Sequence, residues 1–194
     1  MTNKVLLLDT LPDWVVTKLQ DLGCTAVIKT GIAEAEHPNL LKEVNPRILI
    51  VRSTKVSRAM IESAGDLSLI IRSGAGYNTI DVAAASERSI YVSNCPGKNA
   101  IAVAELAMGL ILSLDRRIPD NVADLRQGTW NKKEYSKAKG LFGRTLAVIG
   151  TGNIGKELIQ RAKAFGLHVI AYSRSLTPEG AEALGVTYAP SLID

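Results

Sequence analysis

The chain has 194 residues, of which 46% are hydrophobic, so it can bury a substantial core in one large domain or two small ones. Its 23 basic and 19 acidic residues give a formal net charge of +4, and the charges are interspersed without a run of five or six of one sign. This composition argues against a nucleic-acid partner and supports only a mild preference for anionic small molecules.

The N-terminal segment, MTNKVLLLDT, holds only four consecutive apolar residues before Asp9. This run is too short for a secretion signal or a membrane span, so we expect a cytoplasmic protein without a membrane partner. Cys24 and Cys95 are far apart and lack the spacing of a zinc or redox motif. We therefore expect two reduced thiols and no metal site.

Short runs rich in Val, Ile and Leu alternate with helix-like segments through the first half of the chain. Nearly continuous apolar runs are typical of strands that are buried on both faces of a parallel sheet. The helix-like segment at 12–23 has Pro12 near its start and Gly23 at its end, which are helix start and stop signals. The alternation predicts an α/β fold with a parallel sheet. The apolar runs lie at residues 5–8, 25–28, 47–51, 67–71 and 90–92.

Residues 99–116 form one long stretch rich in Ala, Leu and Ile, with Glu105 as the acid in its middle. The stretch predicts a helix that is buried on nearly all sides. We place a domain boundary near Lys98, so that this helix begins the second domain, and we expect a strand at 145–149 after a basic segment. Because the helix is apolar on more faces than one sheet can cover, we expect a second subunit to pack on it and form a homodimer.

The segment GTGNIG places Gly150, Gly152 and Gly155 at the G-x-G-x-x-G spacing. It lies between a predicted strand and a predicted helix, which favours a dinucleotide-binding turn over a tight turn with nothing bound. Gly150 permits the turn, Gly152 permits close approach of a pyrophosphate, and Gly155 permits close packing of the helix on the strand. The start of the helix, at Asn153 and Ile154, offers free N–H groups to phosphate. The predicted apolar face of this helix comprises Ile154, Leu158, Ile159, Ala162 and Phe165.

The next predicted strand, HVIAY, is followed by the position at which a dinucleotide site selects its cofactor. An acidic residue there bonds the ribose hydroxyls and repels a 2′-phosphate. This chain has Ser173 at that position, followed by Arg174 and Ser175, and an arginine offers phosphate a planar fork of donors. We therefore expect NAD(P) as the cofactor, with NADP(H) favoured. In the alternative interpretation, Arg174 is a solvated cation and the cofactor is NAD(H).

Two loops in the first half follow predicted strands, at the sheet edge where open parallel sheets bind ligands. Arg52 and Ser53 follow the strand at 47–51, and a glycine-containing loop follows the strand at 67–71. Small residues allow the N–H groups of such a loop to face a carboxylate. Taken alone, the loop fits a strand-to-helix turn equally well, and Arg52 fits a surface cation better than a ligand clamp. The residues of the glycine-containing loop are Ser73, Gly74, Ala75 and Gly76.

Four blocks in order, SGAGYNTID, NCPGKNAIAVAELAMGLIL, RQGTWNKKEYSKAKGLFGRTLAVIGTGNIG and AKAFGLHVIAYSR, resemble the D-isomer-specific 2-hydroxyacid dehydrogenases. The resemblance covers nearly the whole chain. Within the family it is strongest to the enzymes that act on 3-phosphoglycerate, while glyoxylate and hydroxypyruvate reductases share most of the same blocks. It implies a flavodoxin-like substrate domain at 1–98 and the first part of a doubly wound Rossmann domain at 99–194. It also implies hydride transfer between NAD(P) and a small 2-hydroxy or 2-oxo acid.

The resemblance assigns roles to single residues. Ser73, Gly74, Ala75 and Gly76 match the loop that binds the substrate carboxylate, and Arg52 and Ser53 match residues that line the substrate pocket. Asn99 and Val103 match positions close to the nicotinamide. The residues that match the pyrophosphate loop are Gly150, Gly152, Asn153, Ile154 and Gly155.

The family's general acid/base is a His oriented by a Glu, with an Arg that holds the carboxylate. His37 and His168 are the two histidines of this chain, and neither lies in a matching motif, so we assign no catalytic residue. We expect the chain to be the N-terminal part of a longer enzyme, in which the strand at 145–149 lacks a partner at one edge. The alternative is a non-catalytic dinucleotide-binding or assembly module.

Overall fold

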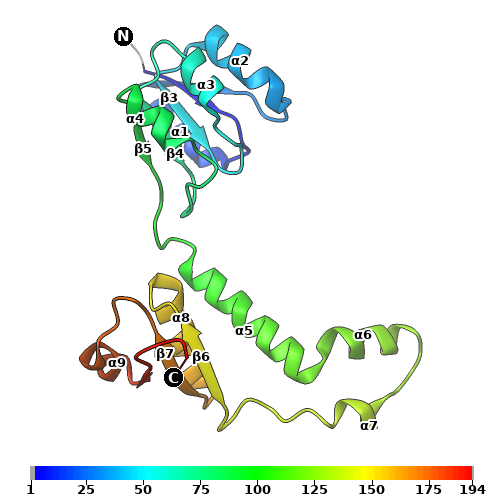
Figure 1. Ribbon diagram of the computed structural model, residues 1–194. Helices are drawn as coiled ribbons and strands as arrows, with labels where there is room; N and C mark the ends of the chain where they lie inside the picture. The colour runs from blue at the N-terminus through cyan, green and yellow to red at the C-terminus, as the bar shows by residue number, and fades with distance from the viewer. Residues whose placement is uncertain (1–2, 194) are drawn as a thin grey trace. The chain divides into compact units, whose positions relative to one another are not determined.

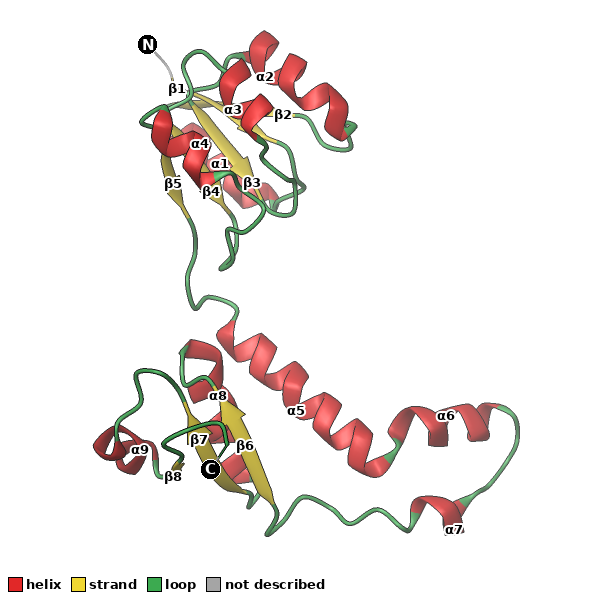
Figure 2. Ribbon diagram, in the orientation of Figure 1, coloured by secondary structure: helices red, strands yellow, loops and turns green. Residues whose placement is uncertain are grey.

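The computed structural model describes residues 3–193, drawn along the chain in Figure 1 and by secondary structure in Figure 2. These residues form two compact units that divide between Lys98 and Asn99. Each unit has its own sheet, and the strands within each sheet are parallel. The predicted α/β fold with parallel sheets is confirmed.

The first unit has a five-stranded sheet in the order β2-β1-β3-β4-β5, which is the flavodoxin-like order. Its strands are β1 (Asn3–Leu7), β2 (Cys24–Ile28), β3 (Ile48–Val51), β4 (Leu69–Arg72) and β5 (Tyr91–Ser93). Its α-helices are α1 (Asp13–Asp21), α2 (His37–Val44), α3 (Arg58–Ser63) and α4 (Val82–Glu87), and a 3-10 turn, η1 (Glu34–Glu36), precedes α2.

Both faces of this sheet are buried. Leu6 and Ile70 pack with side chains of α2, α3 and α4 on one face, and Leu7 and Ile50 pack with side chains of α1 on the other. This double burial explains why the strands read as continuous apolar runs. Because helices cover both faces, ligands can reach the sheet at its carboxyl edge, where the loops after β3 and β4 emerge.

The second unit contains α5 (Ala100–Arg116), α6 (Ile118–Arg126), α7 (Lys132–Tyr135), β6 (Thr145–Ile149), α8 (Asn153–Ala164), β7 (His168–Tyr172), α9 (Pro178–Leu184) and β8 (Thr187–Tyr188). Its sheet has the order β6-β7-β8, so β6 lies at an edge among the described residues. Met108, Val148, Ile159 and Val169 form the centre of its core. In the part of the chain that the structure describes, no helix is long and apolar enough to span a membrane.

The prediction that the long helix is buried on nearly all sides is wrong. In α5, Ala100, Ala104 and Met108 are buried. On another side of the helix, Leu110 is 56% exposed and Leu114 is 80% exposed. The buried residues recur every fourth position and allow α5 to pack along α8 on that face alone. Composition shows that a helix is apolar, but it does not show which of its faces is covered.

The apolar face predicted for α8 is also only partly buried. Ile159 and Ala162 are buried in the core, but Ile154 and Phe165 are exposed by 42% and 45%. Ile154 lies in the first turn of α8 and Phe165 is its C-cap residue. The two exposed residues are therefore at the helix ends.

Candidate functional site

The turn between β6 and α8 has the conformation that its glycines predict. Gly150 has φ +100°, a value that L side chains rarely adopt, and its N–H donates to the carbonyl of Tyr172 at 2.7 Å. A Cβ on Gly155 would overlap the carbonyl oxygen of Gly150, whereas a Cβ on Gly152 would meet open space. Glycine is thus required at 150 and 155 by the fold, and Gly152 leaves the backbone open to an approaching group.

The N-terminus of α8 presents backbone N–H donors. Among the described residues, the N–H groups of Asn153, Ile154 and Gly155 make no hydrogen bond, and no side chain caps the helix. These groups lie at the positive end of the dipole of a 12-residue helix. The turn therefore fits a pyrophosphate, as expected for a dinucleotide-binding strand, turn and helix.

Ser173, Arg174 and Ser175 follow β7, which is the neighbour of β6, so the structure brings them to the same sheet edge as Gly150. Arg174 is exposed, and its guanidinium forms no ion pair with the described residues. A cavity of about 350 Å³ joins the glycine turn to this loop. Its walls include Thr151, Lys156, Ser175 and Leu176.

Sequence reasoning missed Lys156 as a member of this site. Lys156 immediately follows Gly155 and lines the cavity beside Ser175. A cation near a helix N-terminus is disfavoured by the helix dipole unless an anion lies close to it. A lysine in the first turn of the helix, directly after Gly155, is therefore the sequence signal that could have identified Lys156.

In the first unit, the two predicted substrate loops begin side by side. They follow the adjacent strands β3 and β4, and the N–H of Ser73 donates to the carbonyl of Val51 at 2.7 Å. Arg52 and Ser53 are both exposed at the start of the first loop. The structure therefore brings these two residues to the same edge of the sheet as residues 73–76.

Asp9, at the carboxyl end of β1, holds the first of these loops. Its Oδ2 accepts the N–H groups of Arg52 at 2.6 Å and of Ser53 and Thr54 at 3.1 Å each. Burial raises the pKa of Asp9, but the hydrogen bonds from these three backbone donors outweigh burial and leave the pKa below its usual value of 3.8. Since the backbone donors are committed to Asp9, only the side chains of Arg52 and Ser53 remain for a ligand.

The loop after β4 combines backbone N–H donors with the guanidinium of Arg72. Among the described residues, the N–H groups of Ala75 and Gly76 make no hydrogen bond. A Cβ on Gly74 would overlap the guanidinium of Arg72, whose buried Nε also lacks a partner in the part of the chain that the structure describes. Free N–H groups beside an unpaired guanidinium favour an anion. Arg72 was missed from the sequence, although a cation directly before a glycine loop is a usable signal.

The two residues predicted to lie near the nicotinamide open α5. Asn99 is the N-cap residue, and its carbonyl accepts the N–H of Val103 at 3.0 Å, while its side chain makes no capping bond. Glu105 and Arg161 form an ion pair of 3.3 Å between α5 and α8. The second unit thus packs the helix of Asn99 and Val103 against the helix of the glycine turn.

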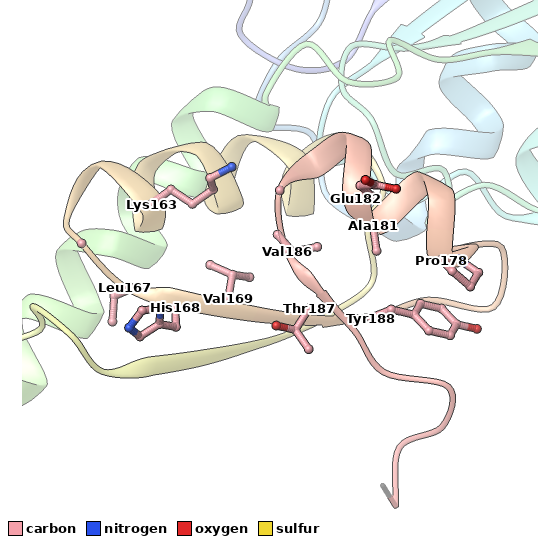
Figure 3. Close-up of a pocket in the computed structure, with 12 residues that line it drawn as sticks. Lys163, Leu167, His168, Val169, Pro178, Ala181, Glu182, Val186, Thr187 and Tyr188 are labelled. Atoms are coloured by element: carbon pink, nitrogen blue, oxygen red, sulfur yellow. The ribbon is translucent and has the colours of Figure 1, made fainter.

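Neither histidine lies in a glycine loop. His37 is buried at the start of α2. His168 pairs in register with Thr145, at the opposite end of β6 from Ile149 and the glycine turn. The two cysteines are free thiols, and the described residues contain no cluster suited to a metal ion. His168 lines a cavity of about 660 Å³ (Figure 3), together with Lys163, Glu182, Thr187 and Tyr188.

Comparison with known proteins gives matches over nearly the whole chain. A family model described as the catalytic domain of D-isomer specific 2-hydroxyacid dehydrogenases matches residues 5–194. The chain is 42% identical over 184 residues to D-3-phosphoglycerate dehydrogenase of Methanocaldococcus jannaschii, covering 94% of this chain and 34% of the relative. It is 49% identical over 147 residues to hydroxypyruvate reductase of Thermotoga maritima, covering 75% and 47%. The chain therefore spans 34% of the length of the first relative and 47% of the second.

Solved structures are similar across both units. An acyclic imino acid reductase in complex with NADPH and D-Arg has a TM-score of 0.80 and 28% sequence identity, covering 96% of this chain and 60% of that one. The TT0316 protein from Thermus thermophilus has a TM-score of 0.84 and 28% identity, covering 96% and 59%.

Proposed function

The chain belongs to the family of D-isomer-specific 2-hydroxyacid dehydrogenases. We propose that it is part of a cytoplasmic oxidoreductase that transfers hydride between NAD(P) and a small 2-hydroxy acid. One observation carries this proposal: each unit has a glycine loop at the carboxyl edge of a parallel sheet, with N–H groups that have no partner among residues 3–193. The loop of the second unit fits a pyrophosphate, and the loop of the first unit fits a carboxylate. When bound, the nicotinamide supplies or accepts the hydride.

The substrate we propose is 3-phosphoglycerate. The similarity to a D-3-phosphoglycerate dehydrogenase over 94% of the chain supports it, and so does the exposed side chain of Arg52, which is free to pair with a phosphate. The similarity to a hydroxypyruvate reductase supports hydroxypyruvate or glyoxylate as the alternative substrate.

Arg52→Ala separates these substrates. A charge-assisted hydrogen bond contributes about 1.5–3 kcal/mol, so the variant is expected to bind 3-phosphoglycerate at least about tenfold more weakly. Its affinity for glyoxylate should stay unchanged, as measured by calorimetric titration. Arg47→Ala is the matched control, because Arg47 is exposed at the amino end of β3, away from the loop. Equal losses for both ligands would instead assign Arg52 to the carboxylate or to the fold.

A non-catalytic dinucleotide-binding or assembly module is the second candidate function. It is favoured because no residue of this chain is assigned as the general acid/base that the reaction needs. A turnover assay of this chain with phosphoglycerate, glycerate and glyoxylate separates the two candidates. Turnover would contradict the module, and tight dinucleotide binding without turnover of any of the three would favour it.

We propose NADP(H) as the preferred cofactor, with NAD(H) as the alternative, because Ser173 cannot repel a 2′-phosphate and the guanidinium of Arg174 is unpaired among the described residues.

We also propose a homodimer. A row of exposed apolar side chains follows α5 and α6, and surfaces of this kind mark protein interfaces. The row comprises Leu106, Leu110, Leu114, Ile118, Val122 and Leu125.

A further inference from the structure

The segment after β5 holds the glycine loop of the first unit by its carbonyl groups. The N–H of Cys95 donates to the carbonyl of Gly74 at 2.9 Å, and the side-chain amide of Asn94 donates to the carbonyl of Ala75 at 2.6 Å. Asn94 is half-buried. Two consecutive carbonyls of the loop are therefore fixed toward residues 94–95.

The direction of these carbonyls sets the direction of the loop's donors. In a trans peptide the C=O and the following N–H point in opposite directions, and the chain has no cis peptide among the described residues. The N–H groups of Ala75 and Gly76 therefore point away from residues 94–95. Both lack an acceptor in the part of the chain that the structure describes.

We propose that Asn94 is a positioning residue for the ligand carboxylate, which fixes the Ala75–Gly76 peptide so that its N–H faces the acid group of the substrate. This inference rests on the proposed function, in which the loop binds a 2-hydroxy acid. Asn94 acts through the Ala75 peptide. Its Nδ2 supplies the donor that an aspartate at the same position lacks.

Glycine at 76 is the reason that the peptide needs this support. Rotation of the peptide between Ala75 and Gly76 changes ψ of the first residue and φ of the second, and a glycine resists such a change less than any other residue. A rotated peptide would present the carbonyl oxygen of Ala75 to an incoming carboxylate and repel it. The hydrogen bond from Asn94 holds that oxygen on the opposite side.

The test compares two ligands that differ in the carboxylate. Asn94→Leu keeps the branching at Cγ and removes the donor, and Asn94→Asp keeps the shape. Because one hydrogen bond is lost, both variants should bind 3-phosphoglycerate about tenfold more weakly than the unmodified chain. The neutral variant Asn94→Leu should bind glycerol 3-phosphate, which has a phosphate but no carboxylate, within about twofold of the unmodified chain. Asn39→Leu is the control, because Asn39 is exposed on α2, and it should change neither affinity.

A second readout needs no ligand. In the ligand-free chain, the amide resonance of Gly76 should shift and broaden in Asn94→Leu, because the peptide then samples two orientations. An unchanged resonance, unchanged affinity for 3-phosphoglycerate, or an equal loss for both ligands would overturn the inference. If the unmodified chain binds no 2-hydroxy acid, the proposed function fails, and the Gly76 resonance still decides the role of Asn94.

Discussion

At the scale of single residues, Asp9 links β1 to the loop of Arg52 and Ser53 through three backbone donors on one oxygen. Its pKa is lowered in the folded chain, so its charge stabilises the fold above pH 3.8, and this contribution is lost as the pH falls through the folded pKa. Asp9→Ala should lower the free energy of unfolding by about 1–3 kcal/mol at pH 7. Asp9→Asn removes the charge alone. In urea titrations, the difference in the free energy of unfolding between the unmodified chain and Asp9→Asn should shrink below pH 3.8.

The exposed pair of Lys18 and Asp21 provides the control for Asp9. Asp21→Asn removes a surface ion pair and should change the free energy of unfolding by less than about 1 kcal/mol. If Asp9→Asn were as stable as the unmodified chain from pH 7 to pH 3, the account of Asp9 would be wrong.

Arg174 is the residue on which the proposed cofactor preference depends. If its guanidinium binds the 2′-phosphate, Arg174→Ala should weaken NADPH binding by about tenfold or more, since a charged hydrogen bond contributes about 1.5–3 kcal/mol. NADH binding should not change, because NADH lacks that phosphate. Fluorescence titration with both cofactors measures this, with Arg126→Ala on α6 as an exposed control. Unchanged NADPH affinity would leave NAD(H) as the preferred cofactor.

At the scale of elements, the turn between β6 and α8 separates glycine's structural role from its binding role. Gly155→Ala forces a Cβ against the Gly150 carbonyl, and such overpacking costs about 1–3 kcal/mol. Gly152→Ala meets open space and should change stability by less than about 0.5 kcal/mol. It should still weaken dinucleotide binding, because its Cβ would take up the space that we propose for the pyrophosphate. Thermal unfolding and cofactor titration of the two variants check this contrast, and equal stability losses would contradict it.

At the scale of the whole molecule, the exposed face of α5 predicts a homodimer. Light scattering of the folded chain at tens of micromolar should give twice its mass of 20.8 kDa. Leu110→Glu places a charge on that face and should give monomers, because an unpaired charge is costly to bury in an interface. Leu22→Glu, at an exposed leucine of the first unit, should leave the dimer intact. A monomer mass for the unmodified chain would contradict the proposed homodimer.

Local patterns predict the strands well because strands buried on both faces are continuous apolar runs. β6 and β7 coincide with the predicted strands at 145–149 and 168–172. The contacts of Asp9 with Arg52 and of Asn94 with Ala75 leave no such pattern, since they depend on which strands are neighbours. The end of the predicted helical stretch at residue 116 agrees with the end of α5, whereas α6 was not predicted. The left-handed residue between the two helices is Arg117, with φ 50°, and no glycine marks the break.

Titration of the ¹⁵N-labelled chain with NADH and NADPH tests most directly whether the turn after β6 binds a dinucleotide. The N–H groups at the start of α8 and the loop after β7 lie at one edge of the sheet. Saturable shifts of the amide resonances of residues 150–155 and 173–175 are therefore expected with at least one cofactor. Resonances at these positions that do not move at millimolar concentrations of either cofactor would contradict the dinucleotide site.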